Sequence, residues 1–374
     1  METKKYRFDE VTINFDKKRI PLSSAQREKR QGTFRYYGAQ GVIDHVDDYI
    51  FDGTYLLIAE DGENLKSKKQ NIAQVVDGQF WVNNHAHIVQ GNEQCDTRFL
   101  CYLINSMDLS GYVTGSAQPK LSQANLNAVT LSLPTLAEQK RIVEYLYMLD
   151  QKIDVNRQIN DNLQQQAFSV FDNLIANAEN NDYTVSDYAF LNPKRTLAKN
   201  QVARSIDMSQ LSTSGAFPSG WEMKPFNGGM RFTNGDTLLA RITPCLENGK
   251  TAFIDFLDDG EVAFGSTEYI VLAPKNDTPP EMLYCLARYP AFVDYAVKNM
   301  NGSSGRQRVS AETVGQYRLP LFDKHSLVLF KEVVSPMFLK MRYNSLENMR
   351  LAELRDALLP KLMSGEIDVS AVQL

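Results

Sequence analysis

IVEYLYMLDQKIDVNRQINDNLQQQAFSVFDNL, residues 142–174, is the stretch that decides the fold of this chain. Positions alternating four and three residues apart are mostly apolar, which gives an average period of 3.5 residues. These positions are Ile142, Leu146, Leu149, Ile153, Asn156, Asn160, Leu163, Ala167, Val170 and Leu174. Such a period is typical of the seam of a coiled coil rather than of an ordinary surface helix. The stretch therefore predicts a long helix that packs against a second helix.

The same seam recurs 188 residues later in the chain. Its positions there are Phe330, Val334, Met337, Met341, Asn344, Asn348, Leu351, Arg355, Leu358 and Leu362. Both asparagines of the first seam return, so the chain contains an internal repeat. We predict an antiparallel pair of helices in which Asn156 meets Asn348 and Asn160 meets Asn344 around a pseudo-twofold axis. Buried asparagines fix the register, because a slipped alignment would leave an amide facing hydrocarbon.

The segments between the helices repeat as well. FWVNNHAHIV (80–89), which we predict to be a strand with one polar face, is echoed by VAFGSTEYIV (262–271). Thr135 and Glu138 form a capping-box pattern that predicts the start of the first helix. The predicted domains are 1–134, 135–180 (helix), 181–322, and 323–374 (helix and tail).

Composition narrows the class of protein. The chain has 374 residues, 43% of them hydrophobic and 23% charged, which is typical of two ordinary globular domains plus helices. Four scattered cysteines, no signal-peptide pattern at the N-terminus and no long apolar run predict a reduced, cytoplasmic protein without a membrane span. The formal net charge of −5 gives no general attraction to nucleic acid, so a DNA-binding site would need locally concentrated basic residues.

Motifs for catalysis are missing from the sequence. It contains no Asn-Pro-Pro-aromatic run, no G-x-G-x-x-G opening a βα unit and no G-x-x-x-x-G-K-[ST] phosphate loop. The four histidines lack zinc-like spacing with the cysteines, and a metal held by His45, His85 and His87 is the weaker alternative to polar strand residues or DNA contacts. We expect no catalytic residue and no metal in this chain.

Several stretches, taken in order, resemble the specificity (S) subunits of type I restriction-modification systems, the HsdS family. They are YYGAQGVIDHVDDYIFDGTYLLIAEDGEN, FWVNNHAHIV, LPTLAEQKRIVEYL, LLARITPCLENGKTAF, GSTEYIVLAP and LRDALLPKLMSGEIDV, and together they span both halves of the chain. The resemblance implies an α+β fold: two similar mixed α/β target recognition domains joined by two long antiparallel coiled-coil helices. The second helical region departs from the pattern, because it begins LPLFDKHSLVLFKEVV and lacks the Glu-Gln-Lys-Arg of the first.

The resemblance also implies a function. Each recognition domain would read one half of a bipartite sequence in double-stranded DNA, while the helices would set the spacing and dock two methyltransferase (M) subunits. Restriction (R) subunits could join. S-adenosylmethionine would belong to the M subunit, and ATP and magnesium to the R subunit, so this chain itself would hold no cofactor. The complex would be an adenine-specific DNA methyltransferase and, with R, an ATP-dependent endonuclease.

Polar side chains in loops at matching places of the two domains are the predicted DNA contacts. In the first domain these are Tyr36, Tyr37, Gln40, Glu63, Asn64, Lys66, Asn83, Asn84, His85 and Lys120. In the second they are Arg241, Thr243, Glu247, Asn248, Lys250, Ser266, Thr267, Arg306, Gln307 and Arg308. Asparagine and glutamine can pair bidentately with adenine, and lysine can reach guanine or phosphate.

Roles other than DNA contact stay open for these residues. Any one of them could be an ordinary solvated or structural polar side chain, Tyr36 and Tyr37 could belong to the core, and the glutamates could brace a basic neighbour. For the whole chain, the alternative is a non-catalytic protein–protein adaptor with two similar domains on a coiled-coil spacer.

Overall fold

The computed structural model describes residues 2–67, 70–115, 118–178, 182–303 and 305–367. The chain divides into two compact units: unit 1 comprises Met1–Asp150 and Glu353–Leu374, and unit 2 comprises Gln151–Ala352. Both divisions fall inside long helices, α6 (Leu136–Ala176) and α11 (Lys324–Ser364). Each unit therefore contains one end of each helix. The predicted boundary between residues 180 and 181 and the end of the predicted tail, 368–374, lie outside the described residues.

Unit 1 contains two four-stranded sheets within its described residues. The first is formed, in spatial order, by β2 (Thr12–Asn14), β9 (Ala86–Gly91), β6 (Tyr55–Ala59) and β7 (Ala73–Val76). The second is formed by β4 (Gly41–Val46), β3 (Gln31–Gly38), β8 (Gln79–Val82) and β5 (Phe51–Asp52). Strands β3 and β8 run parallel. A separate antiparallel pair joins β1 (Lys4–Arg7) to β10 (Thr130–Leu133).

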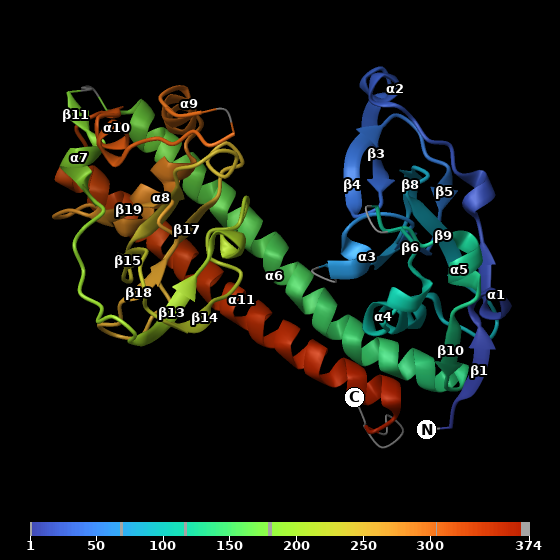
Figure 1. Cartoon of the computed structure of the whole chain (residues 1–374). Coiled ribbons are helices and arrows are strands. Elements are labelled where there is room, and N and C mark those ends of the chain that lie inside the picture. The colour runs from blue at the N-terminus through green and yellow to red at the C-terminus, as the bar shows by residue number, and fades with distance from the viewer. Residues whose placement is uncertain (1, 68–69, 116–117, 179–181, 304, 368–374) are drawn as a thin grey trace. The chain divides into compact units, whose positions relative to one another are not determined.

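Unit 2 repeats this topology position by position (Figure 1). Its first sheet is formed by β12 (Ala189–Leu191), β19 (Tyr269–Pro274), β16 (Thr237–Ala240) and β17 (Thr251–Phe253). Its second is formed by β14 (Glu222–Pro225), β13 (Val202–Ile206), β18 (Ala263–Gly265) and β15 (Met230–Phe232). The parallel pair, β13 and β18, lies at the place of β3 and β8. The predicted internal repeat is confirmed.

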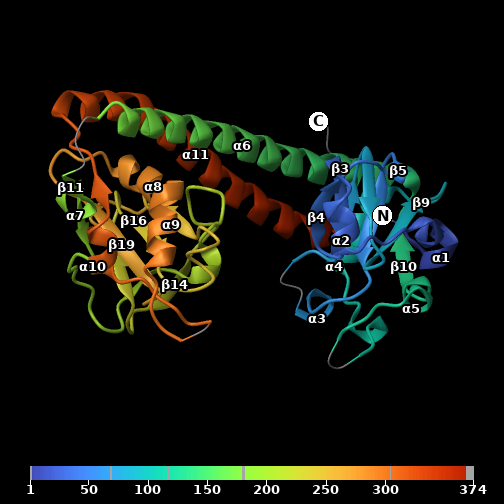
Figure 2. The same cartoon turned by 90° about the horizontal axis from the view of Figure 1, so that it is seen from above.

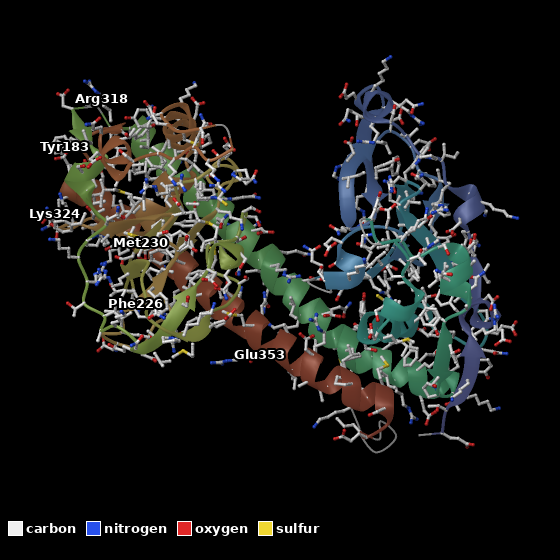
Figure 3. All side chains as sticks on the ribbon, in the orientation of Figure 1. Tyr183, Phe226, Met230, Arg318, Lys324 and Glu353 are labelled. Carbon is white, nitrogen blue, oxygen red and sulfur yellow. The ribbon has the colours of Figure 1, made fainter. Side chains whose placement is uncertain are left out.

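The edge of unit 2 carries the counterpart of the β1–β10 pair. Strands β11 (Tyr183–Thr184) and β20 (Arg318–Leu319) pair antiparallel, with Thr184 opposite Arg318. Tyr183 and Arg318 mark this pair in Figure 3, and Lys324 marks the start of α11. The chain thus passes from β20 into the second long helix, as it passes from β10 into the first.

Shorter helices complete each unit. In unit 1 they are α1 (Phe8–Val11), α2 (Ser24–Glu28), α3 (Asn64–Ser67), α4 (Thr97–Ser106), α5 (Gln123–Asn127) and the 3-10 turns Asp16–Lys18 and Ser110–Tyr112. In unit 2 they are α7 (Val185–Tyr188), α8 (Pro280–Arg288), α9 (Pro290–Lys298), α10 (Ala311–Gly315) and the 3-10 turn Met208–Gln210. Helix α4 packs on β6 and β7, and α8 packs on β16 and β17. One face of the first sheet is covered by a helix in both units.

Alternation along the strands divides the core of unit 1 into layers. Leu56 and Ile58 of β6 face α4, whereas Leu57 faces the space between the two sheets. This follows from the two-residue period of a strand, which sends successive side chains to opposite faces. Tyr36 and Trp81 pack on the far side of the second sheet.

The prediction of one strand at 80–89 is wrong. The segment forms β8 and β9, which belong to different sheets, with a turn at 83–85 between them. The Asn83 side-chain oxygen accepts a hydrogen bond from the His85 N–H at 2.8 Å and closes this turn. Asparagine favours such local side-chain-to-backbone bonds, and this turn chemistry outweighed the apolar alternation.

The long helices begin and pair as the sequence predicts. Glu138 accepts hydrogen bonds from the Thr135 N–H at 2.9 Å and hydroxyl at 2.8 Å, which caps α6. In unit 2, Asn156 Nδ2 donates to Asn348 Oδ1 at 2.9 Å, and Asn344 Nδ2 donates to Asn160 Oδ1 at 2.8 Å. Both predicted pairings are confirmed, and they make α6 and α11 antiparallel.

The antiparallel pairing continues in unit 1, where α11 returns to the first domain. Arg355 donates to Asp150 of α6 at 2.8 Å. Leu362 belongs to the same core as Ile142 and Leu146. Figure 2 shows the end of α11 beside the start of α6. The last turns of the second helix are therefore part of the first unit.

Substituting one asparagine of the seam should destabilise unit 2. Asn344 is 1% exposed, so Asn344→Leu leaves the Asn160 oxygen without its donor. We expect a loss of about 1–3 kcal/mol in the free energy of unfolding, measured by urea denaturation. The double variant N160L/N344L should recover most of the loss, because two leucines fit a coiled-coil seam. Additive losses in the double variant would contradict this account of the pairing.

Candidate nucleic-acid interface

Three loops of unit 1 meet where β6 ends and β9 begins. The Glu60 N–H donates to the His85 carbonyl at 2.9 Å, and the Leu121 N–H donates to the Glu60 carbonyl at 2.8 Å. Asp61 and Lys120 form a β-bridge. The backbone thus brings together the turn at 83–85, the segment after β6 and the segment before α5. We call this the unit 1 site.

Acidic residues organise the cations of the unit 1 site. Glu60 accepts from Arg19 at 2.9 Å and pairs with Lys120 at 3.2 Å. Burial by itself would raise the pKa of Glu60, but the bonds from Arg19 and Lys120 bring the pKa below its ordinary value. His85 Nδ1 lies 2.8 Å from Asp61 Oδ2. Because the side chains of Lys120 and His85 are 54% and 50% exposed, both can still meet a ligand.

The predicted contacts of the first domain divide into exposed and buried residues. The exposed ones are Gln40, Glu63, Lys66, Asn84, His85 and Lys120. Lys66 Nζ donates to the Gly115 carbonyl at 2.8 Å, so this lysine also supports the loop that leads to Lys120.

Four predictions in the first domain are wrong, because the residues are buried. Tyr36 is fully buried and its hydroxyl accepts from the Leu22 N–H at 2.8 Å, while Tyr37 packs between the sheets. Asn64 donates to the Gln70 carbonyl at 2.7 Å, and Asn83 closes the turn at 83–85. Their polar groups hold loops in shape and do not face a ligand.

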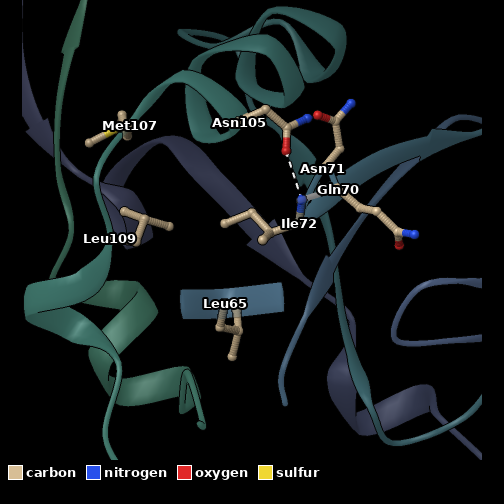
Figure 4. Close-up of a pocket in the computed structure, with 7 residues that line it drawn as sticks. All are labelled: Leu65, Gln70, Asn71, Ile72, Asn105, Met107 and Leu109. Carbon is tan, nitrogen blue, oxygen red and sulfur yellow. Dashed lines mark hydrogen bonds between the residues drawn. The ribbon is translucent and has the colours of Figure 1, made fainter. Parts of the chain in front are cut away.

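A small cavity lies under α3. Leu65 of α3 lines it together with Ile72, Met107 and Leu109, and the cavity measures about 50 Å³ (Figure 4). Asn105 Oδ1 closes its polar side by accepting from the Ile72 N–H at 3.0 Å. The space has room for water and for no larger ligand, so we assign no binding role to it.

The same three loops meet in unit 2. The Arg241 N–H donates to the Glu268 carbonyl at 3.0 Å, and the Thr243 N–H donates to the Gln307 carbonyl at 3.0 Å. Ile242 and Arg308 form a β-bridge, as Asp61 and Lys120 do in unit 1. We call this the unit 2 site.

Arg308 is clamped by a glutamate. Its Nε lies 3.0 and 2.9 Å from the two carboxylate oxygens of Glu268, and its Nη2 donates to Glu268 Oε1 at 2.7 Å. Hydrogen bonds from Arg308 hold the pKa of Glu268 below its ordinary value. Arg241 Nε lies 3.9 Å from the same carboxylate. The Arg308 side chain remains 38% exposed and keeps one orientation.

The other predicted contacts of the second domain differ in how far their side chains are exposed. Glu247, Asn248, Thr267 and Arg306 are exposed, and Thr243 and Gln307 are half-buried. Lys250 Nζ donates to the Met208 carbonyl at 2.8 Å, and Ser266 Oγ accepts from the Glu268 N–H at 3.1 Å. Both bonds are structural, and Ser266 closes its turn as Asn83 does in unit 1.

Sequence reasoning missed the acids that organise both sites. Glu60 and Asp61 in unit 1, and Glu268 in unit 2, were not predicted, and neither was Arg19, a cation that donates to Glu60. A signal was present: Glu60 and Asp61 lie three and two residues before the predicted Glu63, and Glu268 follows the predicted Ser266-Thr267 pair. The predicted residues are mostly side chains that could donate to bases, whereas these acids accept hydrogen bonds and position the donors.

The described residues contain neither a metal-binding cluster nor a membrane-spanning helix. No cluster of three or more His, Cys, Asp or Glu side chains there is arranged to hold a metal ion. Among the helices of that part of the chain, none combines the length and apolarity needed to cross a membrane.

Comparison with known proteins gives consistent matches. Residues 2–165 match the family model described as the type I restriction modification DNA specificity domain. A putative type I restriction enzyme specificity subunit of Haemophilus influenzae is 36% identical over 138 residues. That match spans 37% of this chain and 35%, about a third, of the relative's length.

Two further comparisons extend over most of the chain. The type I restriction enzyme HindI specificity subunit of H. influenzae is 23% identical over 402 residues, covering 84% of each chain. The crystal structure of a type-I restriction-modification system S subunit from M. genitalium has a TM-score of 0.59 and 15% identity, over 97% of this chain and 96% of that one. At this identity the structural likeness establishes the fold: mixed sheet domains combined with long helices.

Proposed function

We propose that the chain belongs to the type I restriction-modification specificity subunit family and that its two units each read one half of a bipartite sequence in double-stranded DNA. One observation carries this proposal. The same backbone arrangement occurs in both units, but it presents Lys120 and His85 in one and Arg308 in the other. The same backbone arrangement with different hydrogen-bond donors suits the recognition of two different half-sites, because DNA sequence is read by side chains at the edges of the bases.

The proposal extends to partners. Two M subunits would dock on the helical regions and carry S-adenosylmethionine and the adenine methylation, while R subunits with ATP and magnesium could join. Apolar side chains that α6 and α11 leave exposed, such as Val155 (48%), Leu339 (42%) and Tyr343 (57%), support docking of this kind. This chain would be the non-catalytic subunit, act in the cytoplasm, and set the separation of the half-sites through its helices.

Methylation mapping tests the proposal directly. Expressed with a methyltransferase subunit in a host that lacks DNA modification, the chain should direct adenine methylation to one bipartite motif with a fixed gap. Omitting this chain should abolish the motif, and gel shifts of the assembled complex should follow the same sequence. The alternative, a protein adaptor, predicts assembly with partners but no sequence-specific methylation or DNA binding.

A further inference from the structure

His87 is a buried histidine close to the unit 1 site. It lies on β9, is 1% exposed, and both its ring nitrogens have partners. Nδ1 lies 2.6 Å from Asp16 Oδ2, and Nε2 lies 2.8 Å from the Leu121 carbonyl oxygen. Leu121 directly follows Lys120 of the unit 1 site.

The partners define the protonation state of this ring. A carbonyl oxygen only accepts hydrogen bonds, so Nε2 must carry a hydrogen. An ionised carboxylate also only accepts, so Nδ1 must carry one as well. A ring with hydrogens on both nitrogens is the positively charged imidazolium. His87 is thus a buried cation that ties β9 both to the 3-10 turn at Asp16 and to the loop that carries Lys120.

Two acidic and two basic side chains form a linked network of ion pairs beside the ring. Asp16 is the nearest acid, and Glu60 Oε2 lies 3.9 Å from Nδ1. Arg19 lies 3.5 Å from Asp16 and 2.9 Å from Glu60, and Lys120 lies 3.2 Å from Glu60. Burial by itself would lower the pKa of His87, but the bonds to Asp16 and Leu121 raise it above its ordinary value. Burial acts in the opposite sense on Asp16, whose pKa is nevertheless lowered by His87 and the Ile88 N–H.

We propose that the His87 imidazolium is a positioning residue, which locks the Lys120 loop onto β9 and so holds the unit 1 site in its reading conformation. This inference rests on the proposed function of that site. A neutral ring carries only one N–H and must release either Asp16 or the Leu121 carbonyl. Beside an ionised Asp16 the remaining hydrogen is best placed on Nδ1, because a hydrogen bond to a charged acceptor is the stronger one. Deprotonation would therefore release the Leu121 carbonyl and free the loop that carries Lys120.

Unit 2 lacks this device at the matching position. The strand register places Ile270 opposite Leu239, where unit 1 has His87 opposite Ile58. Ile270 is fully buried, and its side chain has no group that titrates. A pH effect of His87 should therefore be confined to the first half-site, and the second half-site is a control within the same molecule.

The sign of the pH dependence follows from the raised pKa of His87. The lock is fully present below the ordinary pKa of histidine and is lost as the pH rises through the folded-state value. Affinity for the first half-site should fall over the same interval. At the acid end, the lowered pKa of Asp16 keeps its carboxylate ionised to lower pH than usual.

Asp16→Asn is the informative variant. Asp16 Oδ1 also accepts the Ile88 N–H at 2.8 Å, and an amide oxygen can keep that bond. Unit 2 uses an asparagine in this way, because Asn192 Oδ1 accepts the Val271 N–H at 2.9 Å. The substitution puts an amide NH2 in place of the carboxylate oxygen that faces Nδ1, so the ring should lose its proton about one pH unit or more below the wild type. The amide then donates to the neutral Nδ1, and Nε2–H stays on the Leu121 carbonyl.

The experiment has two readouts on the full-length chain. Nitrogen-15 NMR of the four histidines should show both His87 nitrogens protonated at pH 7, with titration at lower pH in Asp16→Asn. Hydrogen exchange of a peptide from the Lys120 loop should speed up with the titration in the wild type, and should show no such step in Asp16→Asn, where the neutral ring keeps its Nε2–H on the Leu121 carbonyl. His325→Gln, an exposed histidine of α11, is the matched control and should change neither midpoint.

DNA binding by the assembled complex completes the test. Duplexes altered in one half-site at a time should show a pH midpoint for the first half-site in the wild type that is absent in Asp16→Asn, and none for the second half-site in either protein. A neutral His87 at pH 7, or first half-site binding with the same pH profile in both proteins, would overturn the inference alone. The absence of any sequence-specific DNA binding would overturn the proposed function, and the inference with it.

Discussion

Arg308→Ala is expected to lower the affinity of the assembled methyltransferase for its DNA about tenfold to a hundredfold, through the second half-site alone. An arginine has five N–H donors, and Glu268 and the Arg306 carbonyl engage one each on Nε, Nη2 and Nη1. One N–H on each terminal nitrogen remains for a DNA acceptor. A well-made bidentate arginine contact contributes about 1–3 kcal/mol of discrimination, which sets the expected range.

Matched variants separate charge from geometry. Arg308→Lys keeps the charge but not the planar fork, so we expect an intermediate loss. Glu268→Gln removes the clamp and should relax specificity at one base position more than it reduces affinity. Lys324→Ala, in an exposed ion pair with Asp277 at 3.2 Å, is the control and should bind as the wild type does. Equal binding by Arg308→Ala and wild type, with the methyltransferase still assembled, would remove Arg308 from the interface.

Phe338→Ala should have the largest effect on stability, about 3–5 kcal/mol in the free energy of unfolding of unit 2. Phe338 of α11 is 1% exposed. Its ring lies edge-on to Phe253 of β17 at 5.2 Å and to Tyr284 of α8 at 5.5 Å between centroids. It therefore joins the long helix to both the sheet and the covering helix of this unit, and its removal opens a cavity in the core.

The neighbouring residue supplies the control. Leu339 is 42% exposed, so Leu339→Ala should cost well under half as much in guanidinium denaturation. Hydrogen exchange should locate the loss from Phe338→Ala in α8 and β17. If protection in those elements were unchanged, the ring would not be the link between helix and sheet that its contacts indicate.

The sequence predicted the fold well because its strongest signals are periodic. The 3.5-residue seam and its repeated asparagines specified both helices, their direction and the pairs Asn156–Asn348 and Asn160–Asn344. The 3.5-residue period of a coiled-coil seam is unaffected by changes in the lengths of loops. A polar side chain in an apolar seam has few possible hydrogen-bond partners, so its pairing can be predicted. The prediction of one strand at 80–89 was wrong because a turn closed by Asn83 divides this segment between two sheets.

The sites were predicted less well, because exposure is decided by packing that sequence pattern does not record. Asn64 and Lys66 are two residues apart, yet the first is 5% exposed and bonded to the Gln70 carbonyl, and the second faces outward. Lys120 and Arg308 were identified as basic loop residues. Their partners Glu60 and Glu268 lie far from them in the chain, so only the folded structure brings each pair together.

The discontinuous make-up of unit 1 has a consequence for biosynthesis. Its core contains Ile142 and Leu146 from the first half of the chain and Leu362 from the last helix. A ribosome adding about 5–20 residues per second makes residue 353 roughly 10–40 s after residue 150. During that interval the nascent first domain carries an uncovered apolar surface, on which chaperones can act. Translation that stopped within unit 2 would leave the first domain without its residues from α11. A truncated messenger RNA should therefore give a protein whose N-terminal domain is destabilised.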